Sequence, residues 1–236
     1  MSADPISPAI RFLAWTLAAI FAITLLWVAW IGAHILWYRS HPPQMTSFMA
    51  QRMDEARVRN PNAQLKYQWV PYDSISPNLK RALIAAEDAK FAEHGGFDWD
   101  GIHNALEKNR NKGHVVSGGS TITQQLAKNL FLTPDKSYWR KGQEAVVTVL
   151  LEAMLPKRRI LEIYLNVIEW GNGVFGAEAA AHRYFGVSAA HLSAEQAARL
   201  AAMTPSPRLF ERNPGSPYIA GRVATILARM RSAAAP

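Results

Sequence analysis

Residues 87–98 (EDAKFAEHGGFD) contain the first group suited to chemistry, because Glu87 falls on an otherwise apolar helical face. In a helix, Leu83, Glu87, Phe91 and His94 would lie on one face, because they are four, four and three residues apart. A buried ionised carboxylate costs several kcal/mol unless it is paired or functional. An acid on an apolar face, beside a histidine and a glycine turn, is typical of groups whose pKa is raised for proton transfer. The alternative is an exposed glutamate on a helix whose limits differ from those expected.

The second segment, residues 117–129 (SGGSTITQQLAKN), combines a glycine pair with a helix start. Free backbone N–H groups and the helix dipole make such a start a ready anion-binding site. We expect Ser120 to cap the helix, and Gln124 and Lys128 to continue a polar edge at steps of four. The alternative is a capped helix with a solvated face. The missing Gly-Lys-Ser/Thr ending excludes a Walker loop.

Residues 139–152 (WRKGQEAVVTVLLE) contain a second carboxylate on a mainly apolar face. Glu144 shares this face with Val147, and Arg140 lies one turn before it. One interpretation is an intrahelical ion pair, which stabilises a helix by only about 0.3–0.5 kcal/mol. The functional interpretation is a second acidic group that faces the same cleft as Glu87.

Residues 157–171 (KRRILEIYLNVIEWG) begin with a basic cluster and continue as a broad apolar stripe. We interpret this helix as mainly core, with Glu162 and Asn166 placed to hydrogen-bond each other or a neighbouring loop. The basic cluster is typical of a solvated surface, and near a membrane it would contact lipid phosphates.

Helical periodicity dominates the chain from Ser76 onward, and no series of strands is long enough for a sheet. Ser76, which precedes a proline, and the pair Ser193 and Gln196 are typical helix starts. Residues 108–114 are charged, polar and glycine-containing, which predicts a mobile loop, and residues 67–72 predict a short strand or an extended stretch. The sequence therefore predicts an all-α domain. Helices are expected over residues 46–58, 76–92, 99–109, 120–130, 137–156, 158–167, 174–184, 194–203 and 217–231.

Residues 12–33 form an unbroken run without a charged side chain. The run is long enough to cross a bilayer, which takes about 20 apolar residues. A signal peptide would have only about 7–15 apolar residues before a small-residue cleavage site, whereas this run continues into bulky side chains. Arg11 and Arg39 flank the run, so charge does not decide its orientation. Tryptophans typical of membrane interfaces are Trp15, Trp27, Trp30 and Trp37. The chain divides into a tail (1–11), an anchor (12–37), a linker (38–75) and a globular domain (76–236).

The chain carries a net charge of +8, from 26 basic and 18 acidic residues. This charge suggests an anionic partner such as lipid headgroups or a phosphorylated substrate. Nucleic acid ranks last, because the basic residues are spread along the chain and match no nucleic-acid-binding motif. The absence of cysteine excludes disulfides, thiolate metal sites and a cysteine nucleophile. The sequence requires no cofactor, and a divalent cation is neither required nor excluded.

Taken in order, the four segments resemble the motifs of the peptidoglycan glycosyltransferases of the lysozyme-like family, which polymerise lipid II into glycan strands. The resemblance extends over residues 76–231 and implies a lysozyme-like helical domain on an N-terminal single-pass transmembrane helix. Because the chain continues only briefly past this domain, we expect the monofunctional type, without a transpeptidase half. The matching motifs are EDxxFxxHxGFD at 87–98, GGSTITQQ at 118–125, RKxxE at 140–144 and ILExYLN at 160–166.

The resemblance implies that Glu87 is the general base, which takes the proton from the 4-hydroxyl of the acceptor lipid II. That oxygen attacks C1 of the terminal MurNAc of the growing chain, inverts the anomeric centre and expels undecaprenyl pyrophosphate. Glu144 matches a second glutamate that assists at the donor site or holds its cations in place. Asp88 is implied to orient a donor or a metal, and for His94 we favour a hydrogen-bonded cap near Gly95 over a catalytic neighbour. The implied polar lining of the donor site comprises Ser120, Thr121, Gln124, Gln125, Lys128, Asn129, Lys136, Arg140 and Lys141.

One position departs from the family pattern. Some relatives carry an arginine shortly before RKxxE, aimed at the pyrophosphate, and Lys136 occupies that place here. Lysine supplies charge without the bidentate fork of arginine, so the phosphate role is weaker at Lys136 than at Lys128. Residues 108–116 fall where the family has a mobile jaw over the cleft.

Two other functions compete with polymerisation. A lytic transglycosylase or lysozyme-type hydrolase shares the helical core but needs a general acid and no cations for a pyrophosphate, so GGSTITQQLAK and RKGQE favour synthesis. A catalytically inactive, membrane-anchored scaffold is disfavoured by the presence of both Glu87 and Glu144. The expected partners are lipid II, the growing glycan strand, membrane lipid and other cell-wall synthesis proteins. The resemblance implies the inner membrane, with the catalytic domain on the outer, periplasmic side.

Overall fold

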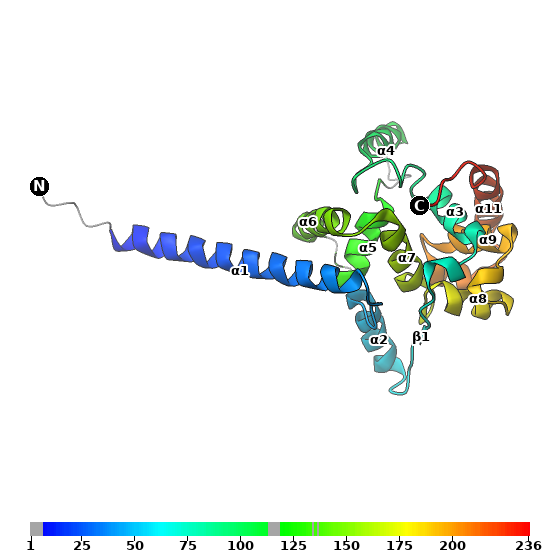
Figure 1. Ribbon diagram of the computed structural model, residues 1–236, viewed down its shortest axis with the longest axis horizontal. Coiled ribbons are helices and arrows are strands. Elements are labelled where there is room, and N and C mark those ends of the chain that lie inside the picture. Colours follow the sequence, from blue (N-terminus) through cyan, green and yellow to red (C-terminus); the bar gives the residue numbers. More distant parts are fainter. Residues whose placement is uncertain (1–6, 113–118, 134, 136) are drawn as a thin grey trace, which may run out of the picture.

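A long helix projects from a helical body in the computed structural model, which describes residues 7–112, 119–133, 135 and 137–236 (Figure 1). Helix α1 (Pro8–Tyr38) begins at Ser7, whose hydroxyl accepts a hydrogen bond from the Ile10 N–H group. Most of its side chains are exposed, and its 31 residues are long and apolar enough to cross a membrane. The expected anchor, residues 12–37, lies wholly within this helix.

The last turns of α1 belong to the folded body. Ile31 and Ile35 are fully buried, and Gly32 lies against the methyl group of Met154 on α6 (Tyr138–Met154). The described residues before Trp27 are all exposed. The helix therefore consists of a free N-terminal part and a C-terminal part that is packed as core.

We expect truncations within α1 to separate membrane binding from stability. Both deletion of residues 1–26 and deletion of residues 1–38 should move most of the protein out of the membrane fraction. Only the longer deletion removes Ile31 and Ile35, which contribute about 1.5–3 kcal/mol each when fully buried. It should therefore have the lower unfolding temperature in a thermal melt. Equal unfolding temperatures for the two truncated proteins would contradict the packing of α1 on the body.

The body is built around α7, whose side chains are buried on nearly all sides. Helices α5 and α6 pack together on one side of it, and α8 packs on another. Helices α3, α9 and α11 form a second packed group. The helices of the body are α2 (Ser47–Arg59), α3 (Pro77–Glu87), α4 (Trp99–Lys112), α5 (Ile122–Phe131), α6, α7 (Lys157–Val167), α8 (Ala177–Phe185), α9 (Ala194–Met203), α10 (Pro207–Arg212) and α11 (Pro217–Arg229), with short 3₁₀ turns at Tyr72–Ser74 and Ala189–His191.

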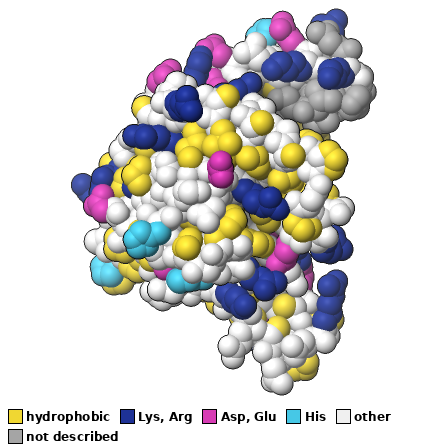
Figure 2. Space-filling model, turned by 90° about the vertical axis from the view of Figure 1, so that its right-hand side faces the viewer, with side chains coloured by type: hydrophobic (Ala, Val, Ile, Leu, Met, Phe, Trp, Pro, Cys, Tyr) yellow, Lys and Arg dark blue, Asp and Glu magenta, His cyan; other side chains and the backbone are white. Residues whose placement is uncertain are grey.

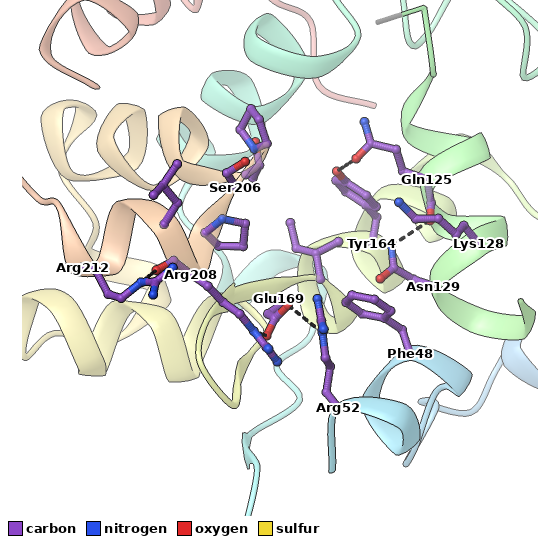
Figure 3. Close-up of a pocket in the computed structure, with 15 residues that line it drawn as sticks. Phe48, Arg52, Gln125, Lys128, Asn129, Tyr164, Glu169, Ser206, Arg208 and Arg212 are labelled. Atoms are coloured by element: carbon purple, nitrogen blue, oxygen red, sulfur yellow. Dashed lines mark hydrogen bonds and ion pairs between the residues drawn. The ribbon is translucent and has the colours of Figure 1, made fainter. Parts of the chain in front are cut away.

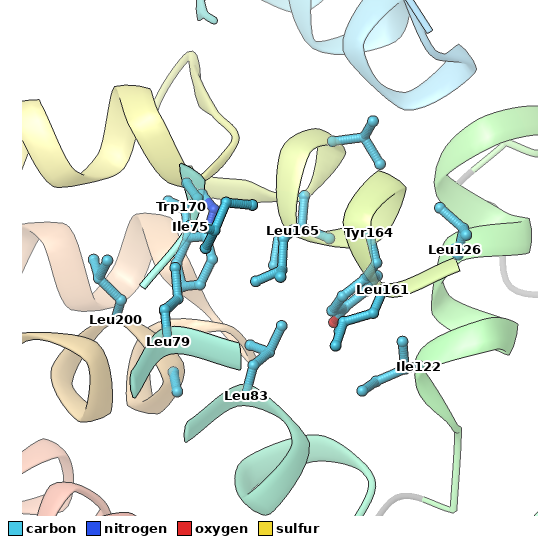
Figure 4. Close-up of a cluster of buried hydrophobic side chains, with 14 of the residues drawn as sticks. Ile75, Leu79, Leu83, Ile122, Leu126, Leu161, Tyr164, Leu165, Trp170 and Leu200 are labelled. Atoms are coloured by element: carbon cyan, nitrogen blue, oxygen red, sulfur yellow. The ribbon is translucent and has the colours of Figure 1, made fainter. Parts of the chain in front are cut away.

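The hydrophobic core joins these two groups of helices through α7 (Figure 4). Leu161 and Tyr164 of α7 lie toward Ile122 and Leu126 of α5, and Leu83 of α3 lies beneath them. All five side chains are buried almost completely. Because α3, α5 and α7 share this core, polar side chains near their ends are held in fixed relative positions.

A small three-stranded sheet lies beside α8, and the sequence did not predict it. The strands are β1 (Lys66–Tyr67), β2 (Glu169–Gly171) and β3 (Val174–Phe175). Their order is β1-β3-β2, with β1 parallel and β2 antiparallel to β3. The expected absence of a sheet was therefore wrong, whereas the all-α fold class is confirmed because the strands have only two or three residues.

Gly176 explains why α8 begins later than predicted. It has a φ of +82°, and a Cβ atom there would lie 2.5 Å from the carbonyl oxygen of Asn166. The predicted helical residues 174 and 175 instead form β3. A close approach of two backbones, which only glycine permits, thus separates strand from helix.

The predicted mobile loop over residues 108–114 was wrong for residues 108–112. Helix α4 continues to Lys112, and residues 113–116 of the predicted loop and jaw lie outside the described residues. Helix α10 was also missed by the sequence prediction, whereas the limits predicted for α2, α6, α7, α9 and α11 agree closely with those observed.

Figure 2 shows the face of the body opposite α1. On the described part of this face, Lys and Arg side chains are scattered among acidic and apolar ones. The face therefore lacks the continuous basic stripe that is typical of nucleic-acid-binding proteins.

Candidate active site

Glu87 is the last residue of α3, and the helix ends there because the next residue bonds to another part of the chain. The buried carboxylate of Asp88 accepts hydrogen bonds from the Ile122 N–H group at 3.0 Å and from His94 at 2.9 Å. Burial raises the pKa of Asp88, and these hydrogen bonds oppose the rise. The predicted continuation of the helix to Ala92 is therefore wrong, and the predicted stripe does not form.

His94 holds the turn that follows α3. Its Nδ1 atom accepts a hydrogen bond from the Gly96 N–H group at 3.1 Å, so its proton lies on Nε2 and points to Asp88. The hydroxyl of Thr121 donates to the Gly96 carbonyl oxygen at 2.7 Å. These contacts favour the interpretation of His94 as a hydrogen-bonded cap near Gly95. They also show that Asp88 orients the backbone at the start of α5.

The Glu87 carboxylate is contacted from three other parts of the fold. The Gln125 amide on α5 donates to one oxygen at 2.9 Å, and the amide oxygen of Gln125 accepts from the Tyr164 hydroxyl at 2.7 Å. The second oxygen accepts from the Thr204 hydroxyl at 2.6 Å and lies 3.5 Å from the Arg222 guanidinium. The side chain is 12% exposed, so its neighbours orient the carboxylate and leave a small part of it at the surface.

The Thr204 hydroxyl has a second acceptor, the Ala201 carbonyl oxygen, at 2.8 Å. A hydroxyl has one proton and can donate to one of these acceptors at a time. When Glu87 is ionised, the proton of Thr204 points to the carboxylate. When Glu87 is protonated, the carboxyl group donates to Thr204 and the hydroxyl turns to Ala201. Thr204 can therefore hydrogen-bond Glu87 whether the carboxyl group is ionised or protonated.

Gln125 and Thr204 also line a pocket with a volume of about 430 Å³. One wall consists of Gln125, Lys128 and Asn129 on α5, with Tyr164 beside them (Figure 3). The amide of Asn129 donates to the Gln125 carbonyl oxygen at 2.7 Å, which fixes its position on this wall. Arg208 and Arg212 of α10 lie on the opposite side, and Phe48 and Arg52 of α2, which packs against α5, lie between the two sides. The pocket is thus a polar cavity, and two of the residues that line it hydrogen-bond Glu87.

Lys128 is a partly buried cation on the pocket wall. Burial lowers its pKa, Glu144 and Glu87 raise it, and Arg140 and Lys141 lower it. Its ammonium group has no hydrogen-bond or ion-pair partner among the described residues. Lys128 thus lies within electrostatic reach of both predicted catalytic acids, and its unpaired charge is suited to bind an anion.

Glu144 is paired with cations on its own helix. One oxygen accepts from the Arg140 guanidinium at 2.6 Å, and the other contacts the Lys141 ammonium group. The Glu144 side chain is only 4% exposed and does not line the pocket. The ion-pair interpretation of this segment is therefore confirmed for Arg140, with Lys141 as a second partner. The expected second acid facing the same cleft as Glu87 is instead enclosed by its partners.

The start of α5 differs from the prediction. Thr121, not Ser120, is the N-cap, and it forms a capping box with Gln124. Both are buried, whereas Ser120 is exposed outside the helix. The predicted polar edge of Ser120, Gln124 and Lys128 was therefore wrong, because the Gln124 amide points back to the Thr121 backbone. Lys136 lies outside the described residues.

Sequence reasoning missed Thr204 and Arg222. Thr204 follows the last turn of α9, and Arg222 lies within the amphipathic pattern of α11, so neither belongs to a recognisable motif. Only the packing of α3, α9 and α11 brings them to Glu87. In the part of the chain that the structure describes, no group of three or more His, Cys, Asp or Glu side chains is placed to hold a metal ion.

Comparison with known proteins gives one consistent result. A family profile described as Transglycosylase matches residues 54–231. Three similar proteins are each named biosynthetic peptidoglycan transglycosylase. The protein from Azoarcus sp. (strain BH72) is 57% identical, over 96% of this chain and 97% of its own length. The protein from Dechloromonas aromatica (strain RCB) is 56% identical over 96% and 98%, and that from Chromobacterium violaceum is 56% identical over 93% and 96%.

Proposed function

Because the chain belongs to the transglycosylase family, we propose that it polymerises lipid II into glycan strands. The chain is a glycosyltransferase of peptidoglycan synthesis with a lysozyme-like helical domain. The observation that supports the lipid II assignment is that one pocket is lined by Lys128, an unpaired cation, and by Gln125 and Thr204, which orient the carboxylate of Glu87. A reaction that removes a proton from a hydroxyl and releases a diphosphate needs both groups.

In the proposed reaction, Glu87 removes the proton from the 4-hydroxyl of the acceptor sugar. The oxygen attacks C1 of the donor sugar from the face opposite the diphosphate, so the anomeric configuration inverts. Gln125 and Thr204 hold the carboxylate so that a lone pair faces the hydroxyl. Tyr164 fixes the Gln125 amide, which keeps its N–H₂ group turned toward Glu87.

The leaving undecaprenyl diphosphate gains negative charge as the C1–O bond breaks. Lys128 is placed to stabilise this charge, and its partial desolvation strengthens the interaction. Glu144 does not take part in proton transfer in this proposal. It holds Arg140 and Lys141 in place, and these extend the positive region beside Lys128.

We place the catalytic domain at the outer surface of the inner membrane, with α1 as its anchor. On α6, Tyr138 and Trp139 are exposed, and this helix packs beside α1 (Figure 1). Exposed aromatic side chains near a membrane helix are suited to the headgroup region, where a lipid-linked diphosphate lies.

We expect Thr204→Val to lower kcat for glycan formation by about tenfold, because hydrogen bonds to charged groups contribute about 1.5–3 kcal/mol. Valine keeps the shape of threonine but cannot hold either protonation state of Glu87. A thermal melt should show an intact fold, and Thr204→Ser should recover most of the lost rate. Full activity of the valine variant would remove Thr204 from the account.

The experiment that tests the proposed function supplies the purified, full-length protein with lipid II. We expect a glycan polymer, released undecaprenyl diphosphate, and glycosidic bonds whose anomeric configuration is opposite to that of the donor. Shortening of supplied glycan strands, without synthesis from lipid II, would identify a lytic enzyme instead.

A further inference from the structure

Three arginines that belong to none of the four motifs line the pocket apart from Lys128, and we call them the arginine wall. Arg52 comes from α2, and Arg208 and Arg212 come from α10 (Figure 3). The pocket extends from this arginine wall to Gln125 and Thr204, the two residues that hydrogen-bond Glu87. A group bound at the arginine wall would therefore belong to a molecule that also reaches the general base.

Two of these arginines are fixed by a buried carboxylate. Glu169 is 5% exposed, and its two oxygens accept from the Nε atoms of Arg52 at 3.2 Å and of Arg208 at 2.6 Å. Glu55 also contacts both guanidinium groups, at 2.7 Å and 3.5 Å. Arg52 in addition lies over the ring of Phe48. These contacts orient the two guanidinium groups before any ligand binds.

Arg212 has a different environment. Its Nε atom donates to the Arg208 carbonyl oxygen at 3.3 Å, and it has no acidic partner in the part of the chain that the structure describes. Three arginines thus face two glutamates, so the wall keeps a net positive charge. Ion pairs among Arg52, Glu169 and Arg208 are sufficient to join α2, β2 and α10. This structural role does not explain the presence of a third arginine, Arg212.

We infer that the arginine wall binds the diphosphate of the acceptor substrate. This inference rests on the proposed function, in which the donor and the acceptor each carry a lipid-linked diphosphate and only the diphosphate of the donor leaves. The leaving diphosphate gains charge, which suits the desolvated Lys128 on the other wall. The acceptor diphosphate keeps its charge throughout the reaction, which suits preoriented arginines that bind it equally before and during the reaction.

Arg212→Gln is the most informative variant, because Arg212 makes the fewest contacts within the fold. Arg59→Gln is its matched control, since it removes the same charge from an exposed arginine on α2 that does not line the pocket. Arg208→Lys is a second variant, which keeps the charge next to Glu169 but loses the guanidinium fork.

The assay separates the two substrates. The donor is lipid II whose 4-hydroxyl is methylated, so that it cannot accept. One acceptor carries the disaccharide on a lipid phosphonate that cannot leave, and a matched acceptor carries a neutral alkyl group instead of the diphosphate. We expect Arg212→Gln to raise KM for the charged acceptor by about tenfold. KM for the neutral acceptor, KM for the donor and kcat should not change, and Arg59→Gln should match the wild type.

A third acceptor, charged but without its stem peptide, identifies the anion. The effect of Arg212→Gln should persist with it, and its loss would assign the wall to a peptide carboxylate and overturn the inference. Equal effects of Arg212→Gln on charged and neutral acceptors, an effect on the donor KM alone, or no effect would also overturn it. No product from wild-type protein with unmodified lipid II would instead show that the proposed function itself is wrong.

Discussion

Glu87→Gln is expected to abolish glycan formation from lipid II while the protein stays folded. Glutamine has the size of glutamate but cannot accept the proton of the acceptor hydroxyl. General bases typically contribute about 10²–10⁴-fold to the rate. We expect a loss near the upper limit, because the carboxylate among the residues that line the pocket, Glu169, is already bound by two arginines and cannot replace Glu87.

The measurement is the initial rate of polymer formation, together with a thermal melt of the same protein. Glu93→Gln is the matched control, because Glu93 is exposed and lies in the same motif segment. This control should keep the wild-type rate. A Glu87→Gln protein that forms polymer at the normal rate would remove Glu87 from its role.

Lys128→Met is expected to have the second-largest effect. Methionine keeps the length of the lysine side chain but cannot stabilise the leaving diphosphate, and removal of one such group typically costs about 10²–10³-fold in kcat. The variant should be at least as stable as the wild type, because a partly buried cation without a partner destabilises the folded state.

A loss of activity without a loss of stability distinguishes a functional lysine from a structural one. Kinetics with lipid II measure the activity, and the unfolding temperature measures the stability. Lys66→Met, which changes an exposed lysine on β1, should alter neither. A loss of activity below about threefold would show that Lys128 is peripheral to the reaction.

Much of the helical architecture follows from local sequence signals. Helix α9 begins at Ser193 with the predicted capping box, and α6 begins at Ser137 as predicted. Apolar periodicity also identifies α7 as a core helix, and Asn166 bonds a neighbouring loop at Val70, as expected. Such signals are sufficient where residues of the helix itself hydrogen-bond the free backbone groups at its ends.

The limits of α3 and α5 were not predictable in this way, because partners distant in sequence decide them. Asp88 leaves the helix to accept from the Ile122 N–H group, 34 residues away. Ser120 and Thr121 are both suitable caps, and the bond from Thr121 to Gly96 favours the second. These long-range bonds appear only when the fold is known.

The candidate site shows the same division. Its motif residues Glu87, Gln125 and Lys128 were identified from sequence. In the structure, Gln125 and Lys128 line one pocket, and Gln125 hydrogen-bonds Glu87. Thr204 and Arg222 complete the surroundings of Glu87 and come from segments without a motif. Glu144 was predicted to face the same cleft as Glu87, and only the structure shows that Arg140 and Lys141 enclose it.

The most direct test of the account measures two products in one reaction. Wild-type protein and Glu87→Gln each receive lipid II, and released undecaprenyl diphosphate is counted against new glycosidic bonds. We expect one diphosphate for each bond with wild-type protein, and neither product above background with Glu87→Gln. Diphosphate release without bond formation, or undiminished bond formation by the variant, would contradict the account.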